Sequence, residues 1–133
     1  MHATAKHIRI SPKKANLVAG LVRRKGVTEA LDILKFTPKK AAPLIAKVIA
    51  SAAANAKANL KQDIEKLQIK EIIINEGTTF KRSLPISRGR THPIRKRNSH
   101  IKVFLETKPE EKVKKVTPAP KAEPATKPET PNK

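Results

Sequence analysis

The first sixty residues carry apolar side chains at the three-and-four spacing of amphipathic helices. A first helix is predicted to begin at Ser11, a favourable N-cap residue, followed by Pro12, which suits the first helical position. We expect Gly26 to end this helix after a basic last turn, where the helix dipole favours cations. The predicted apolar stripe consists of Leu17, Leu21, Val18 and Val22.

Two more helices are predicted before residue 61. The first is short, begins with Thr28 as its cap and runs through Lys35. We expect this helix to bury Ala30, Leu31 and Leu34, and the chain to bury Phe36 directly after it. The second is expected from about Ala41 to Leu60, because Pro43 would disrupt a helix that began much earlier. Its expected buried face is Ile45, Ile49, Ala52, Ala56 and Leu60.

Three segments, residues 2–10, 67–76 and 99–106, have the alternating pattern of β-strands. The alternation changes phase in the middle segment, so we expect a bulge near Glu71. The chain between about residues 77 and 99 is predicted to leave the body as a hairpin. The expected fold is therefore α+β: a small three-stranded antiparallel sheet packed on three helices, with a long protruding basic β-hairpin.

One domain is expected, and it is followed by a change in composition. Residues 1–106 would form the body with its hairpin. Residues 107–133 are rich in Pro, Lys, Glu and Ala, with too few apolar side chains to form a core. We therefore expect them to be a disordered tail.

The predicted hairpin is strongly basic. Residues 80–101 read FKRSLPISRGRTHPIRKRNSHI and contain seven Lys and Arg residues but no acidic residue. If strand pairing continues outward, each leg has about a dozen residues and the arm is about 40 Å long. A two-stranded ribbon is marginal in water, and its like charges repel one another. We expect a surrounding polyanion to order the arm, and the free arm to be mobile.

The charge of the whole chain agrees with a polyanionic partner. Its formal charge is +19 over 133 residues. Its three aromatic residues, all Phe, are too few for platforms that stack unpaired bases, which favours recognition by charge and shape. Cysteine is absent, so disulfides and thiolate metal sites are excluded. No apolar run suits a secretory signal or a membrane span, and we expect a cytoplasmic chain.

The order of these elements and several short motifs resemble the bacterial large-subunit ribosomal protein twenty-two family. The matching pieces lie within residues 5–105 and are AKHIRISPKKANLVAGLVRRKGV, EALDILKFTPKKAA, SAAANA, INEG and RGR…KRNSHIKVFL. The resemblance implies binding to large-subunit ribosomal RNA and neighbouring ribosomal proteins, and support of subunit assembly. It also implies a hairpin tip that lines the peptide exit tunnel beside the nascent peptide. No cofactor, metal, membrane or homo-oligomer is expected.

Two basic zones supply the candidate RNA-binding residues. From the first part of the chain they are His7, Arg9, Lys13, Lys14, Arg23, Arg24 and Lys25. From the hairpin and its return strand they are Lys81, Arg82, Arg88, Gly89, Arg90, Arg95, Lys96, Arg97 and His100. By resemblance, the segment 81–90 lies at or near the tip and 95–97 on the returning leg. Ile86 and Asn16 stand where the family commonly has a basic residue, so each would remove one RNA contact.

Two other functions are open on the residues alone. An architectural DNA-binding protein could carry the same basic β-arm, and the SPKK stretch from Ser11 fits a minor-groove reader. An enzyme is disfavoured, because the four histidines lack metal-ligand spacing and no glycine-rich phosphate loop is present. Ser11 and Lys14 match the S-x-x-K of some acyl-transfer enzymes, but helix capping already accounts for the serine.

Overall fold

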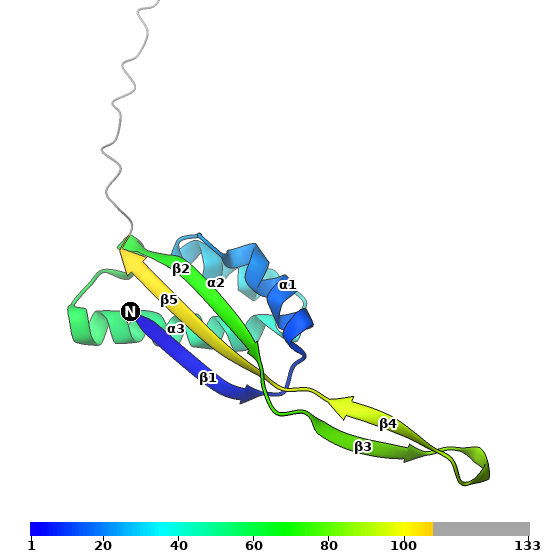
Figure 1. Ribbon diagram of the computed structural model, residues 1–133. Helices are drawn as coiled ribbons and strands as arrows, with labels where there is room; N and C mark the ends of the chain where they lie inside the picture. The colour runs from blue at the N-terminus through cyan, green and yellow to red at the C-terminus, as the bar shows by residue number, and fades with distance from the viewer. Residues whose placement is uncertain (108–133) are drawn as a thin grey trace, which may run out of the picture.

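The computed structural model describes residues 1–107, which form three α-helices, five strands and two short 3₁₀ turns (Figure 1). The helices are α1 (Pro12–Val22), α2 (Val27–Phe36) and α3 (Ala42–Leu60). The strands and turns are β1 (His2–Ile8), η1 (Ile64–Lys66), β2 (Leu67–Glu76), β3 (Phe80–Pro85), η2 (Ser87–Gly89), β4 (Thr91–Lys96) and β5 (Ser99–Thr107). The predicted disordered tail, apart from Thr107 in β5, lies outside the described residues.

The central sheet is antiparallel with the strand order β1–β5–β2, so the last strand lies in the middle. Ile69 of β2 pairs with Leu105 of β5. The register then shifts before Glu71, which confirms the predicted bulge. Because of this extra residue, Ile69 and Ile72 are both buried although strict alternation would put them on opposite faces.

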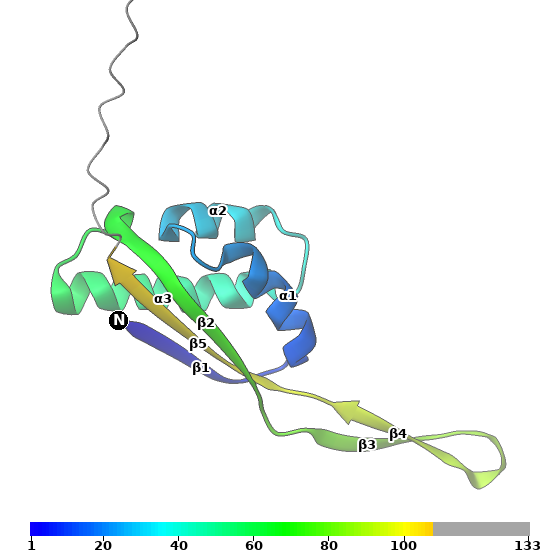
Figure 2. The same cartoon turned by 45° about the horizontal axis from the view of Figure 1, so that its top comes forward.

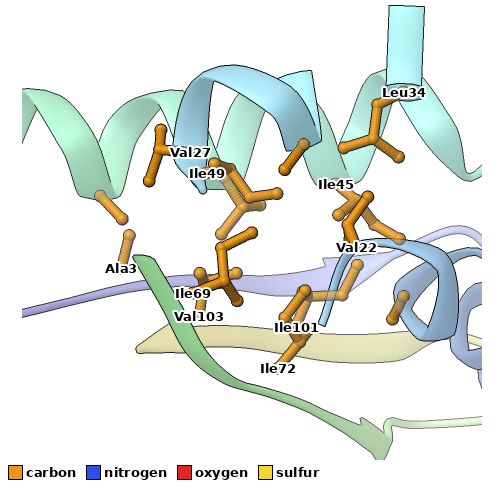
Figure 3. Close-up of a cluster of buried hydrophobic side chains, with 14 of the residues drawn as sticks. Ala3, Val22, Val27, Leu34, Ile45, Ile49, Ile69, Ile72, Ile101 and Val103 are labelled. Carbon is orange, nitrogen blue, oxygen red and sulfur yellow. The ribbon is translucent and has the colours of Figure 1, made fainter. Parts of the chain in front are cut away.

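The three helices cover one face of this sheet (Figures 1 and 2). Between the two layers, aliphatic side chains of α3 meet those of β2 and β5 (Figure 3). Large side chains that are fully buried there include Ile45, Ile49, Ile69, Ile72, Ile101 and Val103. The small side chains of Ala52 and Ala56 are also fully buried and let α3 lie close to the sheet. The predicted α+β architecture is confirmed.

Helix α1 buries a different stripe from the predicted one. Its buried residues are Ala15, Val18, Ala19 and Val22. Leu17 is 77% exposed and Leu21 is 50% exposed, so the prediction was right for the valines and wrong for the leucines. The two stripes lie side by side on the helix, and the one with smaller side chains allows the closer approach to β2 and α3. An apolar pair is consequently left on the surface.

The prediction that Gly26 ends the first helix was also wrong. The chain leaves α1 earlier because the next residues pair with the edge of β2. The backbone N of Arg24 donates to Ile69 O at 3.1 Å, and Ile69 N donates to Lys25 O at 2.9 Å. Gly26 is the N-cap of α2 instead, so Thr28 lies inside that helix and does not cap it.

Two further apolar side chains are exposed against expectation. Phe36 at the end of α2 is 80% exposed, because it lies two positions after the buried Leu34 and so on another side of the helix. Leu60, the last residue of α3, is 55% exposed where the helix extends past the sheet (Figure 1). Leu31 is only partly buried. Ser11 is the N-cap of α1 as predicted, although its side chain makes no capping hydrogen bond.

The hairpin strands β3 and β4 form a separate two-stranded ladder. Pairing in the main sheet stops at Glu76 opposite Ser99 and begins again at Phe80 opposite Lys96. The outer ladder therefore has six residue pairs, about 20 Å in length. The estimate of about 40 Å assumed continuous strand pairing along the arm. The pairing is instead interrupted between the main sheet and the outer ladder. The ladder and its tip project away from the body (Figures 1 and 2).

Candidate nucleic-acid interface

Two cations of the hairpin lie directly opposite each other. In the β3–β4 register Lys81 pairs with Arg95. Directly opposed side chains leave the same face of a ribbon with their Cβ atoms about 5 Å apart, so these two charges repel each other. An anion between them would remove the repulsion and accept charge-assisted hydrogen bonds from both. This face of the arm is therefore suited to a bridging phosphate.

Acidic partners are scarce along the arm. Within residues 1–107, the one ion pair that involves a hairpin cation joins Arg97 Nη1 to Glu76 Oε1 at 2.6 Å. The guanidinium of Arg82 lies over the ring of Phe80, 5.7 Å from its centroid, and donates to the carbonyl of Lys81. All residues from 80 through 97 are exposed. The arm thus presents its cations to its surroundings.

The tip of the hairpin is a short turn with a left-handed backbone. Ile86 N donates to Arg90 O at 2.8 Å and closes the turn. Arg88 and Gly89 both have positive φ, 59° and 68° respectively. Gly89 adopts this region freely, whereas the arginine there costs about 1–2 kcal/mol. The turn brings the cations of Arg88 and Arg90 to the far end of the arm (Figure 1).

Arg9, just after β1, holds the root of the arm. Its Nη1 donates to Arg97 O at 2.8 Å and lies 3.4 Å from Oδ1 of Asn98. Asn98 is 3% exposed, and its backbone carbonyl accepts a 2.9 Å hydrogen bond from Gly77 N. Arg9 was predicted as an RNA contact. In the structure it also connects the first strand to the point where the hairpin returns to the sheet.

His7 and His100 meet beside this root. Their ring centroids are 4.7 Å apart in an edge-on arrangement, and His7 N donates to Nδ1 of His100 at 3.1 Å. His7 has φ of 56°, where the pairing of β1 with β5 becomes irregular. A Cβ added at Gly77 would lie only 3.1 Å from Nε2 of His100. His7 and His100, predicted separately as RNA-binding residues, therefore lie together at the base of the arm.

A groove of about 1010 Å³ separates α1 from the root of the arm. Its cations come from four parts of the chain and are Arg9, Lys14, Lys39, Lys40, Arg95, Lys96 and Arg97. Lys39 and Lys40, in the α2–α3 connection, were missed from the sequence. Nothing in the helical pattern indicated that this connection lies beside the hairpin. Lys13 is exposed on the first turn of α1, outside this groove.

The predicted cations Arg23, Arg24 and Lys25 lie at the other end of α1, away from the arm. Nη2 of Arg23 donates to Oδ1 of Asn16 at 2.7 Å and to a backbone carbonyl of β2. Lys25 forms an ion pair with Glu29. Asn16 thus helps to hold Arg23 against the sheet. These three residues form a second basic area, in which the side chains of Arg23 and Lys25 make contacts within the fold.

Within residues 1–107, no three His, Cys, Asp or Glu side chains are grouped as a metal site would require. None of the helices in that range is both long and apolar enough to cross a membrane. Exposed cations, arranged on an arm and beside its root, are suited to hold a polyanion by charge and shape.

Comparison with known proteins agrees with this geometry. Residues 3–106 match the family described as Ribosomal protein L22p/L17e. The chain belongs to this family of ribosomal proteins. The resemblance described from the sequence is therefore confirmed.

Several relatives share most of their length with the chain, and each is named a large ribosomal subunit protein uL22. The relative from Clostridioides difficile (strain 630) is 55% identical over 106 residues, which are 80% of this chain and 96% of the relative. The one from Oleidesulfovibrio alaskensis is 54% identical over 104 residues, 78% of this chain and 94% of the relative. The one from Ligilactobacillus salivarius is 51% identical over 106 residues, 80% and 92% respectively.

Proposed function

We propose that the chain is a structural component of the large ribosomal subunit and is anchored there by ribosomal RNA around its hairpin. Its relatives carry the name of that subunit. The observation that carries the proposal is the opposed pair of Lys81 and Arg95 on an arm whose cations, among the described residues, have almost no acidic partners. Such an arm gains order and favourable contacts only when phosphates surround it.

The affinity of this arm for RNA should depend strongly on salt. Six hairpin cations lie outside the ion pair with Glu76, namely Lys81, Arg82, Arg88, Arg90, Arg95 and Lys96. Each phosphate that a cation neutralises releases counterions and contributes about −0.7 to −0.9 to the slope of log affinity against log salt. Full engagement of the arm therefore gives a slope of about −4 to −5 from the hairpin alone.

The tip of the hairpin would reach the peptide exit tunnel and line it beside the nascent peptide. The exposed turn at the end of the arm supports this part of the proposal, since it is distant from the body and needs no body contact to form. The body would contact neighbouring ribosomal proteins and RNA near the surface, and support assembly of the subunit. The protein works by binding alone, without a cofactor and as one copy.

Sedimentation tests the proposal directly. The tagged chain is expressed, the cells are lysed, and the lysate is separated on a sucrose gradient in high salt. We expect the chain to travel with the large subunit and to be released only when the subunit unfolds, because its arm is enclosed by RNA. A chain that stays at the top of the gradient, or that follows the nucleoid, would contradict the proposal.

A triple variant separates RNA binding from folding. Arg88, Arg90 and Arg95 are each replaced by Ala, while Arg97 is kept because it pairs with Glu76. All three are exposed, so the circular dichroism spectrum of the body should be unchanged while binding to large-subunit RNA weakens. The matched control replaces three exposed lysines of the body by Ala. Equal RNA binding by the two variants would show that the arm does not anchor the chain. A preference of the unchanged chain for duplex DNA over folded RNA would favour an architectural DNA-binding role.

A further inference from the structure

We propose that the groove between α1 and the root of the hairpin binds an unpaired stretch of RNA, with a base lying on Leu17 and Leu21. This inference rests on the proposed function and names the form of RNA that one part of its surface recognises. The lining of the groove combines seven cations with apolar side chains of α1.

The apolar side of the groove is a pair of leucines one helical turn apart. Leu17 and Leu21 are separated by four positions and therefore lie on one face of α1. They are 77% and 50% exposed, and both line the groove, as do the buried Ile10 and Val18. Leaving two such side chains in water forgoes the stabilisation that burial would give. Their exposure is explained if a flat apolar group covers them in the bound state.

The cations of the groove define the charge of the occupant. Lys14 lies on the same helix, Lys39 and Lys40 on the α2–α3 connection, and Arg95 and Arg97 at the root of the hairpin. None of the residues that line the groove is acidic. A peptide could match these cations only if it were densely acidic, whereas every nucleotide of RNA brings one phosphate. Charge complementarity therefore favours a nucleic-acid strand.

An unpaired strand fits both chemistries better than a duplex. In A-form RNA the base faces are stacked inside the helix, and a protein reaches mainly phosphates, ribose hydroxyls and a shallow groove. A duplex would pair with the cations and leave the two leucines uncovered. An unstacked nucleotide presents a base face and a phosphate together. Aromatic rings, which usually stack on unpaired bases, are scarce in this chain. The guanidinium groups of Arg95 and Arg97 can take their place, since guanidinium planes also stack on splayed bases.

Nuclear magnetic resonance of leucine methyl groups tests this arrangement in the full-length free chain. The probes are single-stranded oligouridine, an RNA duplex of equal charge, and inorganic polyphosphate. We expect oligouridine to shift the methyl signals of Leu17 and Leu21 through the ring current of a base, and the other two probes to leave them nearly in place. Leu60, 55% exposed at the far end of α3, is the internal reference. Methyl shifts that are absent with oligouridine, or equal with all three probes, would overturn the proposal.

A double variant measures the contribution to binding. Leu17→Gln with Leu21→Gln should weaken binding to oligouridine about tenfold and leave duplex binding unchanged, whereas Leu60→Gln should change neither. Unchanged oligouridine binding by the double variant would overturn the groove proposal. Oligouridine binding is measured without ribosomes. A negative result would therefore count against the groove alone, whereas failure of the unchanged chain to sediment with the large subunit would count against the proposed function. In the assembled subunit, a photocrosslinker at position 17 should react with unpaired RNA. Crosslinking to a protein instead would show that a protein occupies the groove and would overturn the proposal.

Discussion

Replacing Arg95 by Glu separates the two demands on the hairpin, order in the free chain and attraction to RNA. Arg95 lies directly opposite Lys81 in the ladder of β3 and β4. The substitution changes a repulsive cross-strand pair into an attractive one on the same face. At the same time it places a negative charge where a phosphate is expected to lie. The free hairpin should therefore become more ordered while its affinity for RNA falls.

The cross-strand register sets the size of the first effect. A directly opposed pair contributes about 0.2–1 kcal/mol, with the sign set by the charges, and exposure to water keeps Arg95→Glu near the lower part of that range at physiological salt. Removing repulsion and adding attraction gives a change of about 0.5–1 kcal/mol in total. Because an isolated ribbon is close to balance between ordered and disordered states, this shifts the ratio of the two about two- to fivefold.

The effect on RNA binding is opposite in sign and larger. A hydrogen bond to a charged group contributes about 1.5–3 kcal/mol, so losing one at Arg95 weakens binding by roughly tenfold or more. The slope of log affinity against log salt should become less negative by about 0.7–0.9 for the lost phosphate contact. Added repulsion from the new carboxylate increases the loss at low salt.

Two assays read these effects in the same protein. Hydrogen exchange of the free chain reports the order of β3 and β4, and filter binding to large-subunit RNA over a range of salt reports affinity and slope. Lys57→Glu is the control, because it makes the same charge change on α3, at the end far from the arm (Figure 1). If Arg95→Glu and Lys57→Glu have equal salt slopes, or if hairpin exchange accelerates in Arg95→Glu, the account of the opposed cations is wrong.

Three further outcomes follow from the body and the root of the arm. Ile49→Ala removes a fully buried side chain and should lower the free energy of unfolding by about 2–5 kcal/mol, measured by urea denaturation; a cost below about 1 kcal/mol would contradict the packing of the core. Arg9→Ala removes the hydrogen bond to Arg97 and should accelerate amide exchange around the root without changing exchange in α3, so uniform acceleration would indicate a general loss of stability instead. Gly77→Ala would bring a methyl group 3.1 Å from the His100 ring, and we expect loss of the edge-on ring contact in the nuclear magnetic resonance spectrum, whereas an unchanged spectrum would show that the ring yields easily.

Local patterns were sufficient to predict the strands and much of α3. Residues 67–76 alternate clearly enough to give the bounds of β2, and the change of phase near Glu71 predicted its bulge. Ile45 and Ile49 are four positions apart and large, so the face of α3 that they define was unambiguous. In these elements only one arrangement buries the apolar side chains.

Helix α1 was harder because two arrangements are possible. Leu17 and Leu21 have the spacing of a core stripe, and so do Val18 and Val22 beside them. The choice depends on how closely β2 and α3 approach, which no local pattern encodes. The end of the same helix was mispredicted for a related reason, since the pairing of Arg24 with the β2 edge involves residues far apart in the sequence.

The candidate site was predicted in part. The sequence indicated the basic arm, because seven cations without an acidic residue are visible in any reading of residues 80–101. It did not indicate that Arg9 reaches the carbonyl of Arg97, a contact between residues 88 positions apart. Nor did it place Lys39 and Lys40 beside the hairpin. Such contacts depend on the way in which helices and strands are assembled, so only the folded structure could supply them.

Hydrogen exchange of residues 80–96, in the free chain and in the large subunit, tests whether RNA orders the hairpin. We expect fast exchange throughout this ladder in the free chain, slow exchange in the core strands β2 and β5, and strong protection of the ladder in the subunit. Protection of the ladder in the free chain would contradict the claim that it needs a polyanion. A ladder that still exchanged fast within the subunit would contradict the claim that RNA encloses it.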